Sequence, residues 1–205
     1  MKLTISCFIY LFIIDVLPAQ DTYQSVINKY RIEQKIEHIN DKRAPLKETD
    51  FNSVHYFKPN EAFVVKAHFI GFSSLDTILI PTSSGKIKKF LKAGILEFSM
   101  KEEKLQLTIF LSTRNSEEAQ SFFLPFRDKT NGRSTYGGGR FMDIPVSALK
   151  DGFLEIDFNK AYNPWCAYSD GFNCPIPPSE NTLNIKIAAG EKKYTGERKE
   201  GSKKS

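Results

Sequence analysis

The sequence predicts a mainly β domain, either an antiparallel β-sandwich or a partly open barrel, with one helix at its N-terminus. The chain has 205 residues, of which 40% are hydrophobic, and this suits one domain with a buried core. Short apolar runs rich in β-branched and aromatic residues recur between turn signals, as in sandwiches and barrels. One segment near the N-terminus has helical periodicity instead.

Residues 1–20 have the pattern of a secretory signal peptide. Lys2 provides a short basic start, and the segment from Cys7 to Leu17 is apolar apart from Asp15. An uncleaved anchor is the alternative, although a membrane span normally needs about 20 apolar residues. We therefore expect export to the periplasm or the extracellular space, with no membrane span once the signal peptide is cleaved.

A helix is expected within residues 21–43, because apolar residues recur at helical spacing there and Thr22 or Asp21 can cap its start. A β-rich domain is then expected over residues 44–190, with the helix packed across the sheet or covering an open end. A hairpin is expected at residues 101–104. The strands are predicted at the apolar runs 62–70, 75–80, 87–91, 95–100, 105–111, 121–126, 153–158 and 183–188.

Residues 191–205 are predicted to form a disordered basic tail, because they have almost no apolar content. Six Lys and Arg residues against three Glu residues give this segment +3 of the net charge of +5. The rest of the chain has no basic stripe interleaved with aromatic residues, which a nucleic-acid interface requires. We therefore expect no nucleic-acid partner.

Residues 123–182 are dense in Gly, Asn, Tyr, Arg and Pro. They contain F-x-D-x-T-N-G-x-x-T-Y-G-G-G-R at 126–140, D-F-N-x-A-Y-N-P-x-C-A-Y at 157–168 and C-P-x-P-P-x-E-N at 174–181. In these motifs the chain resembles the bacterial and archaeal family called domain of unknown function 1684, over about residues 25–192. The resemblance implies homology and a shared fold, and it supplies no activity.

The loops 126–140 and 157–181 are predicted to form a pocket for a small polar or anionic ligand, including ligands derived from glycans. Loops carry function, and arginines can pair with charge while tyrosines stack and asparagines orient a ligand. The predicted ligand-binding residues are Arg127, Asp128, Asn131, Tyr136, Gly138, Arg140, Asn159, Tyr162, Asn163 and Tyr168.

Two local features of these loops have simpler structural interpretations. Gly137 to Gly139 suit either a nest of N–H groups for an anion or a tight bend, and we favour the bend. Asp128 to Gly132 favour a turn, because Asp and Asn side chains bond to the neighbouring backbone.

A hydrolase is the alternative function, with Asp157 or Glu180 as general base or Cys166 as nucleophile. Cys166 and Cys174 form either a disulfide, which we favour, or part of a site. A third alternative is a structural, envelope-associated protein in which the motifs only hold long loops in place.

The three histidines offer no support for a metal site or for an activated cysteine. His38, His55 and His68 all lie in the N-terminal third, far from Cys166 in the sequence and without metal-ligand spacing. We assign them to the surface or to packing, and we expect neither a metal nor a cofactor.

Overall fold

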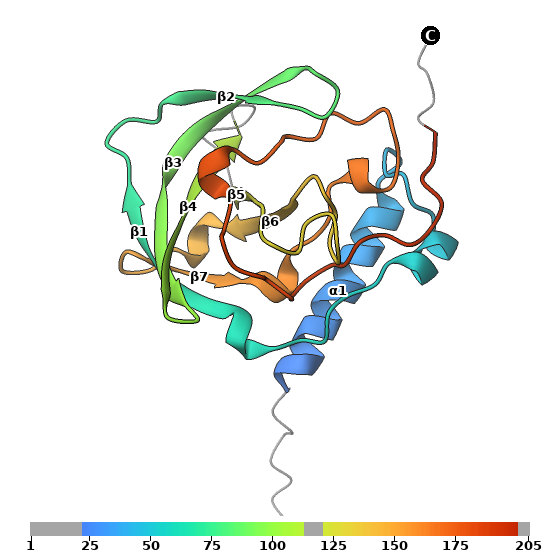
Figure 1. Ribbon diagram of the computed structural model, residues 1–205, viewed down its shortest axis with the longest axis horizontal. Helices are drawn as coiled ribbons and strands as arrows, with labels where there is room; N and C mark the ends of the chain where they lie inside the picture. The colour runs from blue at the N-terminus through green and yellow to red at the C-terminus, as the bar shows by residue number, and fades with distance from the viewer. Residues whose placement is uncertain (1–21, 113–120, 201–205) are drawn as a thin grey trace, which may run out of the picture.

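The protein is described by a computed structural model, which covers residues 22–112 and 121–200 (Figure 1). Over these residues it contains one α-helix and a seven-stranded sheet, joined by turns and short 3-10 helices. The elements are α1 (Tyr23–Asn40), β1 (Val64–Gly71), β2 (Thr77–Pro81), β3 (Ile87–Met100), β4 (Glu103–Ser112), β5 (Ser121–Phe126), β6 (Arg140–Pro145) and β7 (Phe153–Asp157).

The strands form one antiparallel sheet in the order β6-β5-β4-β3-β1-β7, with β2 also paired to β3. The sheet curves until its two ends nearly meet, because Phe141 in β6 pairs with Tyr162 just beyond β7. The predicted mainly β fold is therefore confirmed in its barrel form. Figure 1 shows α1 on the opposite side of the molecule from β1, β3 and β4.

The interior of the barrel is filled by side chains from every main strand. Ala67, Leu96, Ile109, Leu124 and Ile156 are all fully buried in one apolar cluster. Removing each of these Leu and Ile side chains from water contributes about 1.5–3 kcal/mol before entropy is considered, so the core holds the strands together.

Polar contacts help to attach the helix α1 to the barrel. Thr22 caps its start by accepting from the Ser25 N–H, and Ile27 is its only buried residue. The Tyr23 hydroxyl donates to Asp157 Oδ1 over 2.8 Å, which ties the first turn to the end of β7. No described helix has the length and apolar character needed to cross a membrane.

Some predicted strand boundaries were wrong. Residues 87–91 and 95–100 belong to one strand, β3, with an irregular pairing between Lys92 and Gly94. β6 was not predicted, and residues 183–188 are not a regular strand. Leu183 nevertheless packs in the core and donates its N–H to the Arg127 carbonyl, so the segment lies along the barrel without a continuous ladder. The predicted hairpin at residues 101–104 is confirmed by the pairing of β3 with β4.

The prediction of a disordered tail from residue 191 was wrong for residues 191–200. Glu191 is only 2% exposed, and the Tyr194 ring packs edge-on against Tyr168 at 5.2 Å between centroids. Lys199 donates its N–H to the Tyr168 carbonyl over 2.9 Å and pairs with Asp50. Apolar content was a poor guide here because polar contacts hold the segment. Residues 201–205 and the predicted signal segment lie outside the described residues.

Candidate functional site

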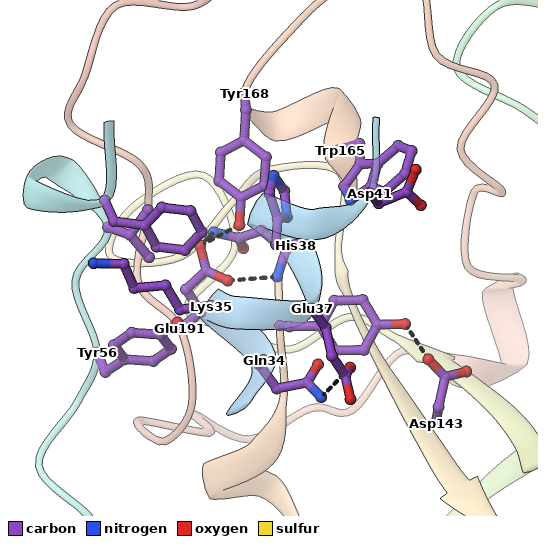
Figure 2. Close-up of a pocket in the computed structure, with 14 residues that line it drawn as sticks. Gln34, Lys35, Glu37, His38, Asp41, Tyr56, Asp143, Trp165, Tyr168 and Glu191 are labelled. Atoms are coloured by element: carbon purple, nitrogen blue, oxygen red, sulfur yellow. Dashed lines mark hydrogen bonds between the residues drawn. The ribbon is translucent and has the colours of Figure 1, made fainter. Parts of the chain in front are cut away.

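A cavity of about 260 Å³ lies between α1, the segment after β7 and the start of the C-terminal segment (Figure 2). We call it the α1 cavity. Aromatic rings and acidic side chains make up much of its wall. Its lining residues are Gln34, Lys35, Glu37, His38, Asp41, Phe51, Val54, Tyr56, Asp143, Tyr162, Asn163, Trp165, Tyr168 and Glu191.

The buried carboxyl group of Glu191 forms the floor of the cavity. It accepts three hydrogen bonds: the Tyr168 hydroxyl and Asn163 Nδ2 donate to Oε1 over 2.5 and 2.6 Å, and the Asn163 N–H donates to Oε2 over 3.0 Å. Within the described ranges no Lys, Arg or His forms an ion pair with it. Burial raises the pKa of Glu191 from 4.5 to about 7.

The side-chain amide of Asn163 has one unsatisfied atom. Its Nδ2 donates both to Glu191 Oε1 and to the Lys192 carbonyl, the latter over 2.8 Å, so these two acceptors fix the orientation of the amide. Asn163 Oδ1 is buried and has no partner in the described part of the chain. A buried carbonyl oxygen without a donor is costly, and a donor that reached this atom would gain free energy.

A second tyrosine–carboxylate pair lies at the rim. The Tyr162 hydroxyl donates to Asp143 Oδ2, and the main chain of Tyr162 is held by its pairing with Phe141. Closure of the barrel therefore places both residues, because β6 carries Asp143 and the segment paired with it carries Tyr162.

His38 faces the cavity from α1. Its Nε2 accepts the Leu46 N–H over 3.3 Å, and its ring lies edge-on to Phe51, Trp165 and Tyr168 at centroid distances of 5.4, 5.8 and 6.0 Å. Burial lowers the pKa of His38 below its ordinary value of 6.5, so the ring is neutral at neutral pH. These contacts confirm the assignment of His38 to packing, but its place in the lining of a cavity was not predicted.

Of the predicted ligand-binding residues, the cavity brings together Tyr162, Asn163 and Tyr168. The prediction for Arg140 was wrong, because Arg140 is fully buried and forms an ion pair with the buried Asp128 at 2.8 Å. Its guanidinium also donates to main-chain carbonyls of residues 187–191. Arg140 and Asp128 therefore hold the C-terminal segment against the barrel and cannot contact a ligand.

The loop 126–140 is a structural turn and forms no part of the cavity. Asn131 Oδ1 accepts the Asp128 N–H, and Asn131 Nδ2 donates to the Tyr136 carbonyl. Gly138 makes room for the Tyr136 ring, since a Cβ there would lie 2.4 Å from Tyr136 Cε1. Arg127 lines no part of the cavity, and its main chain pairs with residues 181–183.

Gly139 shows why the three glycines form a bend rather than an anion nest. Its φ is +97°, and a Cβ would lie 2.6 Å from Pro177 Cγ and 2.8 Å from the Phe126 carbonyl oxygen. Its N–H bonds to the Tyr136 carbonyl, so it is already used within the bend.

The three predicted catalytic candidates also lie outside the cavity lining. Asp157 accepts the Tyr23 hydroxyl and the Asn159 N–H, and Asn159 in turn bonds to the main chain of Asn60. Glu180 lies at the surface 3.6 Å from Lys92. Cys166 is joined to Cys174 in a disulfide and offers no thiol, which bears out the favoured interpretation of the two cysteines.

The fold and this cavity define a small barrel-like domain with a candidate ligand site under an N-terminal helix. The chain belongs to the family described as protein of unknown function (DUF1684), whose model matches residues 49–192. The family match includes Glu191 but not α1. One side of the cavity therefore lies inside the matched region and the other side lies outside it.

One solved structure gives an independent comparison. The chain is similar to an uncharacterized protein from gene locus rrnAC0354 of Haloarcula marismortui, known from a solution NMR structure. The two are 32% identical with a TM-score of 0.68, and the match covers 83% of this chain and 94% of the other. No curated protein matches the chain.

Proposed function

We propose that the chain is an exported protein that binds a small polar molecule in the α1 cavity. The observation that carries this proposal is the cavity of about 260 Å³ with aromatic walls, a buried carboxyl group at its floor and an unsatisfied Asn163 Oδ1 beside it. Binding sites for small molecules are typically concave and aromatic, with a few fixed polar groups that orient the ligand.

The sequence predicted a small polar or anionic ligand. The residues that line the cavity narrow this class of ligand. Arg127 and Arg140, the residues expected to pair with an anion, are both absent from it. Of the described residues, four acidic ones line the cavity against a single Lys. Neutral polar ligands, including those derived from glycans, remain compatible with such a wall, whereas an anion would be repelled by it.

Two features support export. Residues 1–20 have the composition of a signal peptide, and Cys166 is bonded to Cys174. Structural disulfides form and persist mainly in oxidising compartments such as the periplasm and the extracellular space.

A hydrolase is the second candidate function, and the carboxyl that favours it is Glu191. A general acid or base works best with a pKa near the operating pH, and burial brings the pKa of Glu191 to about 7. Asp157, Glu180 and Cys166 are no longer suited to this role, because none of them lines the cavity.

Trp165 provides a direct test, because it is the only Trp of the chain and lines the cavity. Native mass spectrometry of the exported protein is expected to show a copurified mass that is lost on denaturation. Returning this compound to the stripped protein should change the Trp165 fluorescence. Hydrolysis of the compound during incubation would favour the hydrolase.

Filling the cavity from α1 checks where the ligand lies. Gln34→Phe adds bulk to the wall, while Asn28→Phe adds the same ring at an exposed position of the same helix. We expect the copurified mass to disappear in Gln34→Phe and to persist in Asn28→Phe. The proposal is contradicted if the protein copurifies with no ligand and if neither sugars nor amines change the Trp165 fluorescence. The structural, envelope-associated role would then be the remaining interpretation.

A further inference from the structure

We infer that the α1 cavity takes a small organic cation, a protonated amine on a compact ring, whose ammonium group serves as the counter-ion of Glu191. This inference rests on the proposed function, because it names the class of molecule that the cavity binds.

The first step is that Glu191 has no counter-ion of its own among residues 22–112 and 121–200. Arg140 is the buried cation near it, but the Arg140 guanidinium is paired with Asp128 and donates to the Ile187 and Ala189 carbonyls. It reaches only the main-chain carbonyl of Glu191, at 3.4 Å. Buried carboxylates are normally paired, so this one either keeps its proton or acquires a cation from outside.

The second step is that the groups beside this carboxyl need hydrogen-bond donors. Asn163 Oδ1 is buried and has no partner among the residues that the structure describes, and the other end of the same amide is bonded to Glu191. An ammonium group carries several N–H donors and no acceptor, so it can satisfy an amide oxygen as well as a carboxylate. An alcohol supplies a single donor, and a carboxylate ligand supplies none.

The third step is that the aromatic walls already accept cations from the chain itself. The Arg31 guanidinium lies 4.5 Å from the centroid of the Tyr56 ring, and Lys35 Nζ lies 5.4 Å from that of Phe51. Aromatic faces attract cations through the ring quadrupole, more strongly where water is excluded. The Tyr168 ring is buried between the edge-on rings of His38 and Tyr194, and its hydroxyl donates to Glu191. No cation lies over this ring in the described part of the chain.

The fourth step separates an organic cation from a metal ion. Four acidic residues line the cavity, yet nowhere in residues 22–112 and 121–200 do three His, Cys, Asp or Glu side chains come close enough to hold a metal. The acidic groups are therefore spread around an aromatic chamber. Such an arrangement fits a ligand with a charged end and an apolar body.

Three commercially available ligands of similar shape test this inference. Benzylamine, benzyl alcohol and benzoate share one ring and carry a positive charge, no charge and a negative charge. Their dissociation constants are measured by Trp165 fluorescence and checked by NMR shifts of the residues that line the cavity. We expect benzylamine to bind at least about tenfold more tightly than benzyl alcohol, with benzoate weakest.

A substitution of the carboxyl tests whether Glu191 is the counter-ion. Glu191→Gln should weaken benzylamine by about tenfold or more and leave benzyl alcohol within about twofold. The matched control is Glu180→Gln, since Glu180 is a surface carboxylate paired with Lys92 and lies outside the cavity. It should retain the preference for the amine.

The preference for the amine should also grow as the pH rises through about 7, where Glu191 ionises. The other titratable side chains that line the cavity are Lys35, Glu37, His38, Asp41, Tyr56, Asp143, Tyr162 and Tyr168. Burial raises the pKa of the Asp143 carboxyl above its ordinary value. Burial raises the pKa of both Tyr56 and Tyr168 and lowers that of His38, and Arg140 stays charged against Asp128.

The outcomes separate this inference from the proposed function. Equal affinities, tightest binding of benzoate, or an unchanged amine preference in Glu191→Gln overturn the organic cation but leave a small-molecule site. If none of the three ligands changes the Trp165 fluorescence or the NMR shifts, the inference of an organic cation is also overturned. The proposed function then depends on the copurified compound and on the cavity-filling variant.

Discussion

Tyr168 and Glu191 meet beneath the α1 cavity, where the tyrosine hydroxyl donates to Oε1 of the carboxyl over 2.5 Å. Tyr168 follows the disulfide-bonded Cys166, and Glu191 begins the C-terminal segment. The bond therefore joins two parts of the chain that are far apart in the sequence. The protonation state of the Glu191 carboxyl is linked to the stability of both parts.

The first prediction concerns the dependence of stability on pH. The pKa of Glu191 is raised from 4.5 to about 7 in the folded chain, so the folded state holds its proton more tightly than the unfolded state. Stability from this group is present below about pH 4.5 and is lost as the pH rises through about 7, by about 3 kcal/mol. Urea unfolding of Glu191→Gln should show a flatter pH profile than the parent. An identical slope in both would mean that Glu191 does not titrate in this range.

The second prediction concerns Arg140. Arg140→Met leaves Asp128 as a buried charge without its partner, and it removes donors from three main-chain carbonyls. We expect a loss of about 3–5 kcal/mol in the free energy of unfolding. Arg133→Met, at an exposed position of the same loop, should change it by less than about 0.5 kcal/mol. A small loss in Arg140→Met would restore the ligand-binding interpretation of this arginine.

The third prediction separates backbone strain from steric contact at two glycines. Gly132 and Gly139 both have positive φ, of 78° and 97°, but a Cβ at Gly132 meets nothing within 4 Å. Gly132→Ala should therefore cost about 1 kcal/mol from strain alone. Gly139→Ala should cost about 3 kcal/mol or more, because its Cβ would contact Pro177 and the Phe126 carbonyl. Thermal unfolding of the two variants measures both losses of stability. Equal losses would contradict the steric contact at Gly139.

The fourth prediction concerns the C-terminal segment. A chain that ends at Lys193 loses the Tyr194 ring contact and the bonds of residues 198–199 to the segment around Tyr168. We expect a loss of about 2 kcal/mol and faster amide exchange at Tyr168. A chain that ends at Glu200 serves as the control and should match the full chain in both measurements.

The fifth prediction concerns the disulfide. Cys166 and Cys174 are separated by 8 positions, and a closed loop of this size contributes about 2–3 kcal/mol by restricting the unfolded chain. The Cys174→Ser variant and the reduced protein should lose similar amounts in urea unfolding. If addition of a reductant left the unfolding midpoint of the untreated protein unchanged, the two thiols would not be joined in solution.

Much of the fold could be predicted because local patterns agree with it. Alternating apolar runs predicted the main strands, and helical spacing together with Thr22 predicted α1. β6 was not predicted because it follows three glycines and carries Arg140 and Asp143 among its apolar residues. The burial of that arginine depends on Asp128 and on carbonyls far along the chain, which no local pattern contains.

The candidate site could be predicted only in part for the same reason. Tyr162, Asn163 and Tyr168 stand in a dense polar and aromatic motif, and this marked them as site residues. Glu191 stands in a charged segment of ordinary composition, and His38 lies on a helix. Their role arises from the closure of the barrel and the path of the C-terminal segment, which bring them to one cavity.

The order of the elements along the chain also determines when the cavity can exist. Its wall includes α1, which precedes the strands in the chain, and its floor is Glu191, which follows them. The contact between Lys199 and Asp50 that closes the segment over Tyr168 spans 149 positions. A nascent chain therefore has no complete site until the residues through Lys199 have emerged, and a chain terminated before Glu191 has the walls of the chamber without its floor.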